Sequence, residues 1–427
     1  MSALKFSKIS VTFIYSFIVK LGNQTSGTSD ELEKVIKEIK DEKGNAVFKK
    51  YVPEEEYKLN KEYLGIVVPV LPLNSQSSSF RSIGTIFPYK RVYSETEEDF
   101  NSLRKLPCEK WVKINAATGA SVVCIKISLV RQDNRLYEYK DVYGILNEIQ
   151  RFSKPDNRQN NLAPILEEIL KDIKGINKIV ISDESDIKKQ YPYAFIEGEI
   201  DAYINSFYKY LKEEHYDAFM KILCRTSEDD AFISPFHARK HFGYKHVKNL
   251  NPVDSLFCAA HSIATIVMYG RTEKADVKDI YKSISNSVLL ALEYIRMRWH
   301  YLIYANLRLD DVIQKIRKEG DEKNPGNGID NRTAGEKKIT ETLKEIMRTK
   351  EEIARFLEDP QTYSSDANIA EEVIDVLLQK FKIERMQRNI LEKINIVGGL
   401  FNDKRLVLDF EYLNDARETL DKFQNNQ

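Results

Sequence analysis

The sequence predicts an α+β protein: an N-terminal domain with a mixed or antiparallel sheet and helices, followed by an all-α, coiled-coil-like helical region. Two observations lead to this fold class. In the first 135 residues, runs of β-branched and aromatic residues of strand length alternate with insertions, and helical periodicity begins near residue 139. In the last third of the chain, apolar residues recur at alternating intervals of four and three, which is the spacing of a heptad seam.

The strands of the first domain, residues 1–183, are predicted from several segments. "KISVTFIYSFIVKL" and "YLGIVVPVLPL" have the composition and length of strands, and "INKIVISD" adds a short one. "GASVVCIKISLV" is followed by a polar turn and the alternating run "RQDNRLYEYK", which indicates a β-hairpin. "NAATGAS" precedes a strand rather than a helix, so we predict a turn there and not a phosphate loop.

Helices are expected between and after these strands. "SDELEKVIKEIKDEKGN" places four apolar residues on one helical face, and "DVYGILNEIQRF" and "LAPILEEILKDI" are amphipathic. The middle region, residues 184–283, begins with "AYINSFYKYLKEEHYDAFMKIL", which predicts a long aromatic-rich helix. "SLFCAAHSIATIVMYG", Ser255 to Gly270, is uncharged for sixteen residues, short of the roughly 20 that span a bilayer. We therefore predict a buried helix there.

The C-terminal region, residues 284–427, is predicted to form a long helical hairpin or bundle. A helix over residues 285–319 carries a first seam, which consists of Val288, Leu292, Ile295, Trp299, Leu302, Asn306, Leu309, Ile313 and Ile316. A segment rich in glycine and asparagine breaks this helix. A second seam then extends from Ile339 to Leu357, and a third helix from Asp366 to Gly398.

Two seam residues are candidates for an oligomer register. Asn306 stands where leucine is more stabilising, so it either fixes the register between chains or marks a position where the helix is splayed and wet. Trp299 is expected in the core of the seam. Arg296 and His300 flank it and could contact a partner helix or an anionic ligand, but we expect a solvated flank.

Composition limits the classes of function. Lysine and arginine number 65 and so do aspartate and glutamate, which argues against a general binder of polyanions. The four cysteines are scattered without a C-x-x-C pair, which is typical of a reducing compartment. We expect a soluble cytoplasmic protein without a membrane span. Walker, dinucleotide-binding, HExxH and GxSxG motifs are absent from the sequence.

The densest chemical feature is "SPFHARKHFGYKHVKN", residues 234–249, hereafter the basic segment. Its cations and aromatic rings suit a nucleotide or a single nucleic-acid strand. The candidate phosphate- and nucleic-acid-binding residues are Arg239, Lys240, Lys245, Lys248, Phe242 and Tyr244.

The same segment also has the residues of a metal site. His237 and His241 are four apart and share a face on a helix, and His246 and His261 are possible further ligands for a divalent metal. However, Pro235 and Gly243 make a continuous helix doubtful, and no carboxylate lies between the histidines. A solvated basic loop that pairs with the acidic "SEDD" upstream is ranked first, phosphate binding second and metal binding third.

The expectation for function follows from this organisation. We expect a non-enzymatic regulatory or assembly protein, in which an α+β head that binds a ligand or a partner is coupled to a helical region that forms homo-oligomers. The alternative is a nucleotide- or nucleic-acid-binding protein, or a metal-dependent enzyme acting on phosphodiesters, that uses the basic segment.

Overall fold

The structure of the chain is a computed structural model that describes part of its residues. The described stretches are residues 4–21, 67–69, 108–115, 118–129, 136–138, 179–181, 192–204, 256–261, 263–271, 277–321 and 375–400, with single positions between them. By contacts the chain divides into two compact units: Met1–Tyr301 with Pro360–Lys382, and Leu302–Asp359 with Ile383–Gln427. The predicted helix around residues 32–39, the second seam and the basic segment lie outside the described residues.

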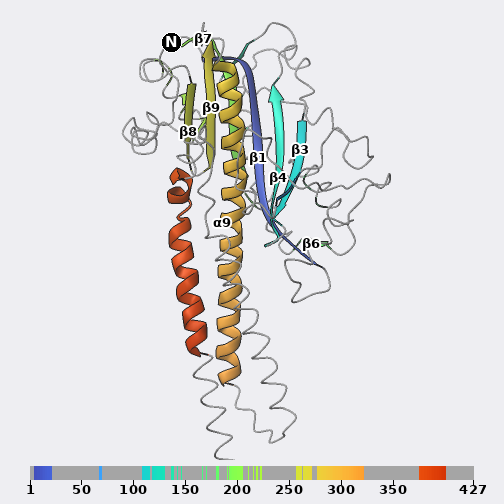
Figure 1. Cartoon of the computed structure of the whole chain (residues 1–427), viewed down its shortest axis with the longest axis vertical. Coiled ribbons are helices and arrows are strands. Elements are labelled where there is room, and N and C mark those ends of the chain that lie inside the picture. The colour runs from blue at the N-terminus through green and yellow to red at the C-terminus, as the bar shows by residue number, and fades with distance from the viewer. Residues whose placement is uncertain are drawn as a thin grey trace, which may run out of the picture. The chain divides into compact units, whose positions relative to one another are not determined.

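A nine-stranded mixed sheet is the centre of the first unit (Figure 1). Its main path has the order β2-β3-β4-β1-β7-β9-β8, and β5 and β6 both pair with β1. Among the described strands, every pairing is antiparallel except that of β7 with β9. The strands are β1 (Lys5–Leu21), β2 (Val67–Pro69), β3 (Cys108–Asn115), β4 (Ala120–Leu129), β5 (Tyr137–Glu138), β6 (Ile179–Ile181), β7 (Tyr193–Tyr203), β8 (Leu256–Ala260) and β9 (Ala264–Arg271). This confirms the predicted α+β class.

The prediction of a hairpin after β4 is wrong, and the set of strands predicted from the sequence was incomplete. β5 pairs with the start of β1 through Phe6 and Tyr137, and β4 pairs instead with β1 and β3. β3 and β7 were not predicted, because charged residues interrupt their apolar alternation. The turn predicted at "NAATGAS" is confirmed: Gly119, with φ 73°, donates to the Asn115 carbonyl at 2.7 Å.

The buried helix predicted for Ser255 to Gly270 is also wrong, because this segment forms the antiparallel strands β8 and β9. The connection between them is closed by the His261 N–H, which donates to the Ala264 carbonyl at 2.7 Å. An uninterrupted apolar run has no period that separates a buried strand from a buried helix. The β-branched residues of β9 were the signal that favoured a strand.

The two faces of the sheet differ in chemistry. Residues directly opposite in a ladder point to the same face, so the register sorts the side chains into two sets. One face is largely apolar, with Val11, Phe13, Ile125, Ile196 and Ile266, and on this side Phe219, at a helical position, packs against Phe257 at 5.3 Å. The other, hereafter the polar face, carries Ser10, Thr12, Ser16, Lys113, Lys126, Tyr193, Glu197, Glu199, Thr265 and Tyr269.

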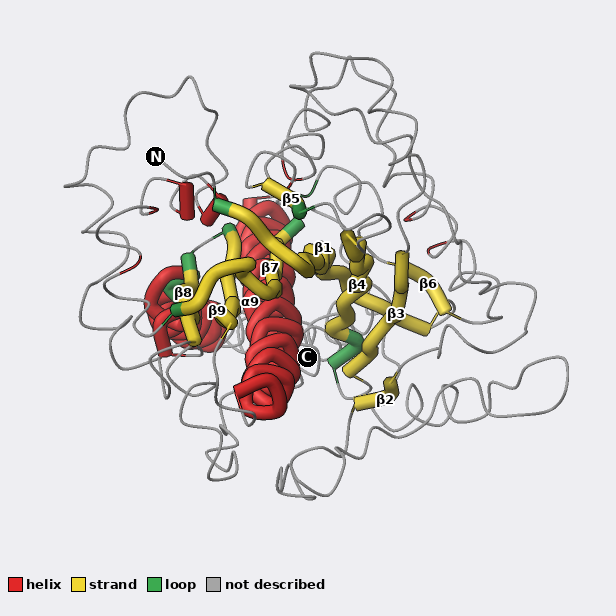
Figure 2. Tube along the Cα trace, turned by 90° about the horizontal axis from the view of Figure 1, so that it is seen from above, coloured by secondary structure: helices red, strands yellow, loops and turns green. Residues whose placement is uncertain are grey.

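The part of helix α9 (Val277–Asp321) that belongs to the first unit, up to Tyr301, packs on the polar face (Figures 1 and 2). The length of α9 confirms the long helix predicted for residues 285–319, which begins eight residues earlier than expected. The seam residues Val288, Leu292 and Ile295 are fully buried in the unit that contains the sheet. These three positions of the heptad pattern therefore serve packing within the first unit.

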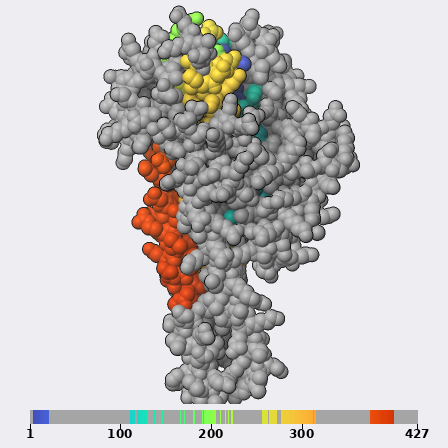
Figure 3. Space-filling view, in the orientation of Figure 1, coloured from blue at the N-terminus to red at the C-terminus, as the bar shows by residue number. Residues whose placement is uncertain are grey.

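A second helical stretch covers residues 375–380 and 383–400, separated by a turn at residues 381–382. Residues 383–400 lie beside α9 in the second unit, where Lys393 pairs with Asp310 at 2.5 Å. Figure 3 shows side chains of residues 375–400 on the surface, and Leu391 and Ile396 are exposed. Among the described helices, none is long and apolar enough to cross a membrane.

Candidate functional site

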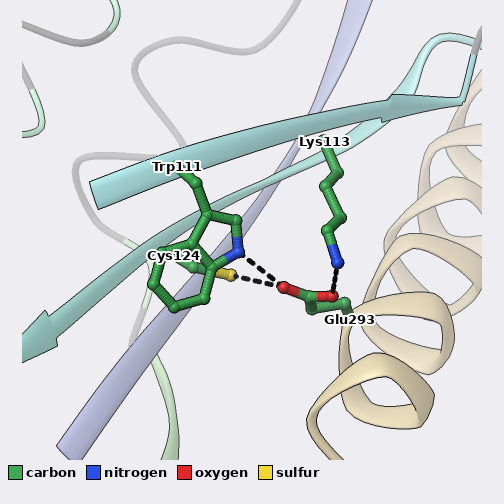
Figure 4. A network of polar contacts seen from close by, with 4 residues as sticks. All are labelled: Trp111, Lys113, Cys124 and Glu293. Carbon is green, nitrogen blue, oxygen red and sulfur yellow. Dashed lines mark hydrogen bonds and ion pairs between the residues drawn. The ribbon is translucent and has the colours of Figure 1, made fainter. Parts of the chain in front are cut away.

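A buried carboxylate of α9, Glu293, is held by three side chains of the sheet (Figure 4). The Trp111 indole N–H donates to Glu293 Oε1 at 2.7 Å, and the Cys124 thiol donates to the same oxygen at 3.4 Å. Lys113 forms an ion pair with Oε2. The side chains of Lys113 and Glu293 are only 9% and 2% exposed, so the pair is closed to bulk water.

The local sequence explains how this cluster forms. Trp111 and Lys113 are two residues apart on β3, so both side chains reach the polar face. Cys124 of β4 lies directly opposite Trp111 in the ladder and points to the same face. Glu293 comes from the helix that covers this face. Burying one carboxylate is tolerable because a cation and two neutral donors satisfy it.

The thiol in this cluster is kept neutral. Burial raises the pKa of Cys124 well above its ordinary value, the negative charge of Glu293 raises it further, and the Lys113 charge opposes both. A thiolate is the nucleophilic form of cysteine, so Cys124 is a weak donor here and not a reactive group. The cluster can fix the position of α9 on the sheet.

A second carboxylate of the polar face, Glu197 of β7, is held in a similar way. Lys126 of β4 forms an ion pair with Oε1, which also accepts a hydrogen bond from the Ser10 hydroxyl at 2.8 Å. The hydroxyl of Ser285, on α9, donates to Oε2. Burial alone would raise the pKa of Glu197, but the Lys126 charge and the hydrogen bonds from Lys126, Ser285 and Ser10 together lower it.

Both clusters tie α9 to the sheet, and they do so two turns apart. Ser285 and Glu293 are eight residues apart, so they lie on one side of the helix, about 12 Å apart along its axis. Tyr281, one turn before Ser285, packs on Tyr269 of β9 with ring centroids 4.3 Å apart. The position of α9 along the sheet is therefore fixed by specific polar partners as well as by apolar packing.

Near the end of the β1–β7 ladder, the side chain of Gln190 makes the hydrogen bonds to the Ser16 backbone that a neighbouring strand would otherwise make. Its Oε1 accepts a hydrogen bond from the Ser16 N–H at 2.8 Å, and its Nε2 donates to the Ser16 carbonyl at 3.2 Å. Oε1 also accepts a hydrogen bond from Arg296 Nη2 at 3.4 Å, and His300 Nδ1 lies 3.4 Å from Nε2. These contacts join α9 to the point where β7 begins.

The expectation of a solvated flank around Trp299 is wrong. Arg296 and His300 are buried, with exposed fractions of 4% and 6%, whereas Trp299 itself is half-buried. The Arg296 guanidinium lies 4.4 Å from the centre of the Trp299 ring and 5.9 Å from that of Tyr193. The arginine is buried because aromatic faces and Gln190 replace its water.

The other predicted site residues divide into two groups. Asn306 lies on α9 in the second unit and is half-buried. The phosphate and metal candidates of the basic segment, namely Arg239, Lys240, Lys245, Lys248, Phe242, Tyr244, His237, His241 and His246, lie outside the described residues. Among the residues that are described, no group of three or more His, Cys, Asp or Glu side chains could hold a metal ion.

Sequence reasoning missed Lys113, Lys126, Glu197 and Glu293. A signal for them existed in charged residues that occupy inward positions of otherwise apolar elements, such as "KWVKIN" and "VLLALEYI". A buried charge requires a partner, but the sequence does not say which residue supplies it.

Comparison with known proteins adds no relative. No protein-family model matches the chain, and no curated protein or solved structure is significantly similar to it.

Proposed function

We propose that this chain is a non-enzymatic regulatory or assembly protein, in which the sheet region is a ligand- or partner-binding head and the helical region oligomerises and transmits the state of the head. The observation that carries this proposal is the placement of α9. Its first part is held on the polar face by the Glu293 and Ser285 contacts, and the same helix continues into the second unit.

The energetics favour a role in positioning. A buried ion pair adds little stability over an apolar pair of similar volume, because desolvation offsets much of the attraction. What buried polar contacts supply is a defined register, since sliding or rotating the helix would leave charges unpaired. A continuous helix of 45 residues, roughly 68 Å long, then carries any displacement of the head along its whole length.

The chemistry of the clusters supports a function without catalysis. Glu293 and Lys113 neutralise each other away from water, and Cys124 is a neutral thiol. An acid–base or nucleophilic group needs access to a substrate and a pKa near the working pH. In the Glu293 cluster the ion pair is closed to bulk water, and burial raises the pKa of the Cys124 thiol well above its ordinary value.

Light scattering tests the assembly part. At tens of micromolar the chain should scatter as a homo-oligomer, above its monomer mass of 49.6 kDa. If Asn306 lies in an interface, Asn306→Leu should raise the thermal midpoint of the oligomer. Gln314→Leu, at an exposed position of the same helix, is the matched control and should leave the midpoint unchanged. A clean monomer over this range would overturn the assembly proposal.

The transmission part has a separate test. Glu293→Gln combined with Lys113→Met removes both buried charges while keeping an acceptor for Trp111, so the chain should remain folded. If α9 transmits the state of the head, this change should shift the dissociation constant of the oligomer several-fold. Glu384→Gln, at an exposed position of residues 383–400, is the control. An unchanged constant in the double variant would leave assembly standing and refute transmission.

A further inference from the structure

The helical stretch at residues 375–400 is interrupted in an unusual way. Lys382 has φ 54°, in the left-handed region, and no other described residue except glycine has a positive φ. This conformation is disfavoured by roughly 5- to 30-fold for a residue with a side chain. The Lys382 N–H donates to the Gln379 carbonyl at 3.1 Å, which is the bond of a helix C-terminus whose left-handed residue is usually glycine.

The sequence itself gives no reason for a break here. Between Asp375 and Val397 there is neither a glycine nor a proline, and the segment "LLQKFKIERMQR" consists mostly of good helix formers. Local preference therefore favours one continuous helix. A contact elsewhere has to compensate for the strained residue and for the interrupted hydrogen bonds.

Phe381, directly before the strained residue, makes that contact. Its ring lies 5.6 Å from Trp299 and 5.8 Å from Tyr193, measured between ring centroids, and the Arg296 guanidinium lies 5.6 Å from its centre. All four residues belong to the first unit. Aromatic pairs and a desolvated cation–π contact are each favourable by an amount comparable to the backbone strain.

We propose that Phe381 is a reversible clasp. Docked against Trp299, Tyr193 and Arg296, it holds the chain broken at Lys382. Undocked, it allows residues 375–400 to form one continuous helix. The two states exchange aromatic and cation–π contacts for relief of strain and additional helical hydrogen bonds, so neither term dominates by a large factor. This device rests on the contacts of Phe381 and does not depend on the function proposed above.

Two variants of residue 382 should move this equilibrium in opposite directions. Lys382→Gly removes the left-handed penalty and weakens a continuous helix, so it favours the docked state. Lys382→Ala keeps the penalty and strengthens the helix. The two variants should differ by roughly 30-fold or more in the docking equilibrium. Lys380→Gly and Lys380→Ala are matched controls, because residue 380 is helical in both states.

Two measurements follow the clasp in the full chain. The chain has two tryptophans, so fluorotryptophan gives two fluorine resonances, which Trp111→Phe assigns. Spin labels at residues 379 and 395, attached by a chemistry that avoids the native cysteines, report the break. In a continuous helix these positions are about 24 Å apart along the axis, and a break shortens this separation.

The expected results are specific. Phe381→Ala displaces the Trp299 resonance and lengthens the 379–395 distance, and Lys382→Gly leaves both as in the docked state. Lys382→Ala shifts them towards the Phe381→Ala values. The proposal is overturned if Phe381→Ala leaves the Trp299 resonance or the distance unchanged, or if Lys382→Gly and Lys382→Ala give the same distance distribution.

Discussion

Lys113 of β3 and Glu293 of α9, which are 180 residues apart in sequence, form an ion pair that is buried between the strand and the helix. Trp111 and Cys124 complete the environment of the carboxylate, so α9 is held to the sheet by one charged contact with two supporting donors. Such a contact is costly to break from one side, because the remaining charge stays buried. That asymmetry leads to the first prediction.

Glu293→Gln should lower the free energy of unfolding by about 3–5 kcal/mol, because it leaves the Lys113 ammonium buried without a counter-charge. Adding Lys113→Met should recover most of this loss. Urea denaturation followed by circular dichroism measures both. Lys282, which lies 3.9 Å from Asp279 on the exposed side of α9, supplies the control: Lys282→Met should change the free energy by no more than about 0.5 kcal/mol. Equal effects at the two pairs would contradict the buried role of Glu293.

The lowered pKa of Glu197 leads us to expect that the stability of the fold depends on pH. Its pKa in the folded chain is lowered: burial alone would raise it, but Lys126, Ser285 and Ser10 outweigh that effect. A carboxyl group with a lowered folded-state pKa stabilises the fold fully above its unfolded pKa, about 4.3, and loses this contribution as pH falls through the folded-state value. The wild type should therefore be more stable than Glu197→Gln at pH 7, and the difference should shrink below about pH 4.

Denaturation midpoints measured between pH 3 and pH 7 test this expectation. Glu384→Gln, at an exposed position of residues 383–400, is the matched control for the removal of a surface carboxylate. A stability difference between wild type and Glu197→Gln that stays constant with pH would show that Glu197 contributes packing and not its charge.

Two buried threonines of the polar face should respond in opposite ways to the same substitution. Thr12 is fully buried and its hydroxyl has no hydrogen-bond partner among the residues that the structure describes, whereas the Thr265 hydroxyl lies 2.7 Å from the Tyr193 hydroxyl. Valine has nearly the same shape as threonine but no polar group. Thr12→Val should stabilise the chain by about 1 kcal/mol, and Thr265→Val should destabilise it by about 1–2 kcal/mol. Thermal unfolding of the two variants measures the pair, and a loss of stability in Thr12→Val would reveal a partner for that hydroxyl.

The sequence predicted secondary-structure elements correctly where the apolar residues followed a single strong periodicity. The β1 strand and the long α9 helix follow directly from a β-branched run and from a seam that extends through Val288 and Leu309. The segment at β8 and β9 is uncharged from Ser255 to Gly270, so no charged residue sets a period, and its pairing with β7 depends on partners about 70 residues away. Strand pairing over such distances is decided by tertiary contacts.

The two polar clusters could not be predicted from the sequence for a related reason. Glu293 stands in the run "VLLALEYI", where the sequence shows one acid in an apolar environment. Its partners come from β3 and β4, and β3 was not predicted at all, since Lys110 and Lys113 interrupt its apolar residues. Pairing of charges can be expected from burial, but the identity of the partner requires the topology.

The basic segment, residues 234–249, carries the last prediction. If it binds phosphate-bearing ligands, affinity for a fluorescent single-stranded oligonucleotide should depend on Arg239, Lys240, Lys245 and Lys248 and should fall steeply with salt. About four phosphate contacts imply a slope near −3 in a plot of log affinity against log salt concentration. Replacing the four residues with glutamine should abolish binding, and the matched pair Lys278→Gln with Lys282→Gln, at exposed positions of α9, should not.

Metal binding by the same segment predicts the opposite pattern. Elemental analysis of the purified chain would then find a divalent metal that His237→Ala or His241→Ala removes and that the four glutamine replacements retain, because neutral imidazole and not lysine coordinates zinc. His300→Ala is the control, since His300 lies on α9 beside Gln190. If oligonucleotide affinity and metal content are both insensitive to these changes, the segment is a basic surface loop that pairs with the acidic "SEDD" before it. That outcome is the one we rank first, because a loop of this composition needs no ligand when opposite charges lie so close in sequence.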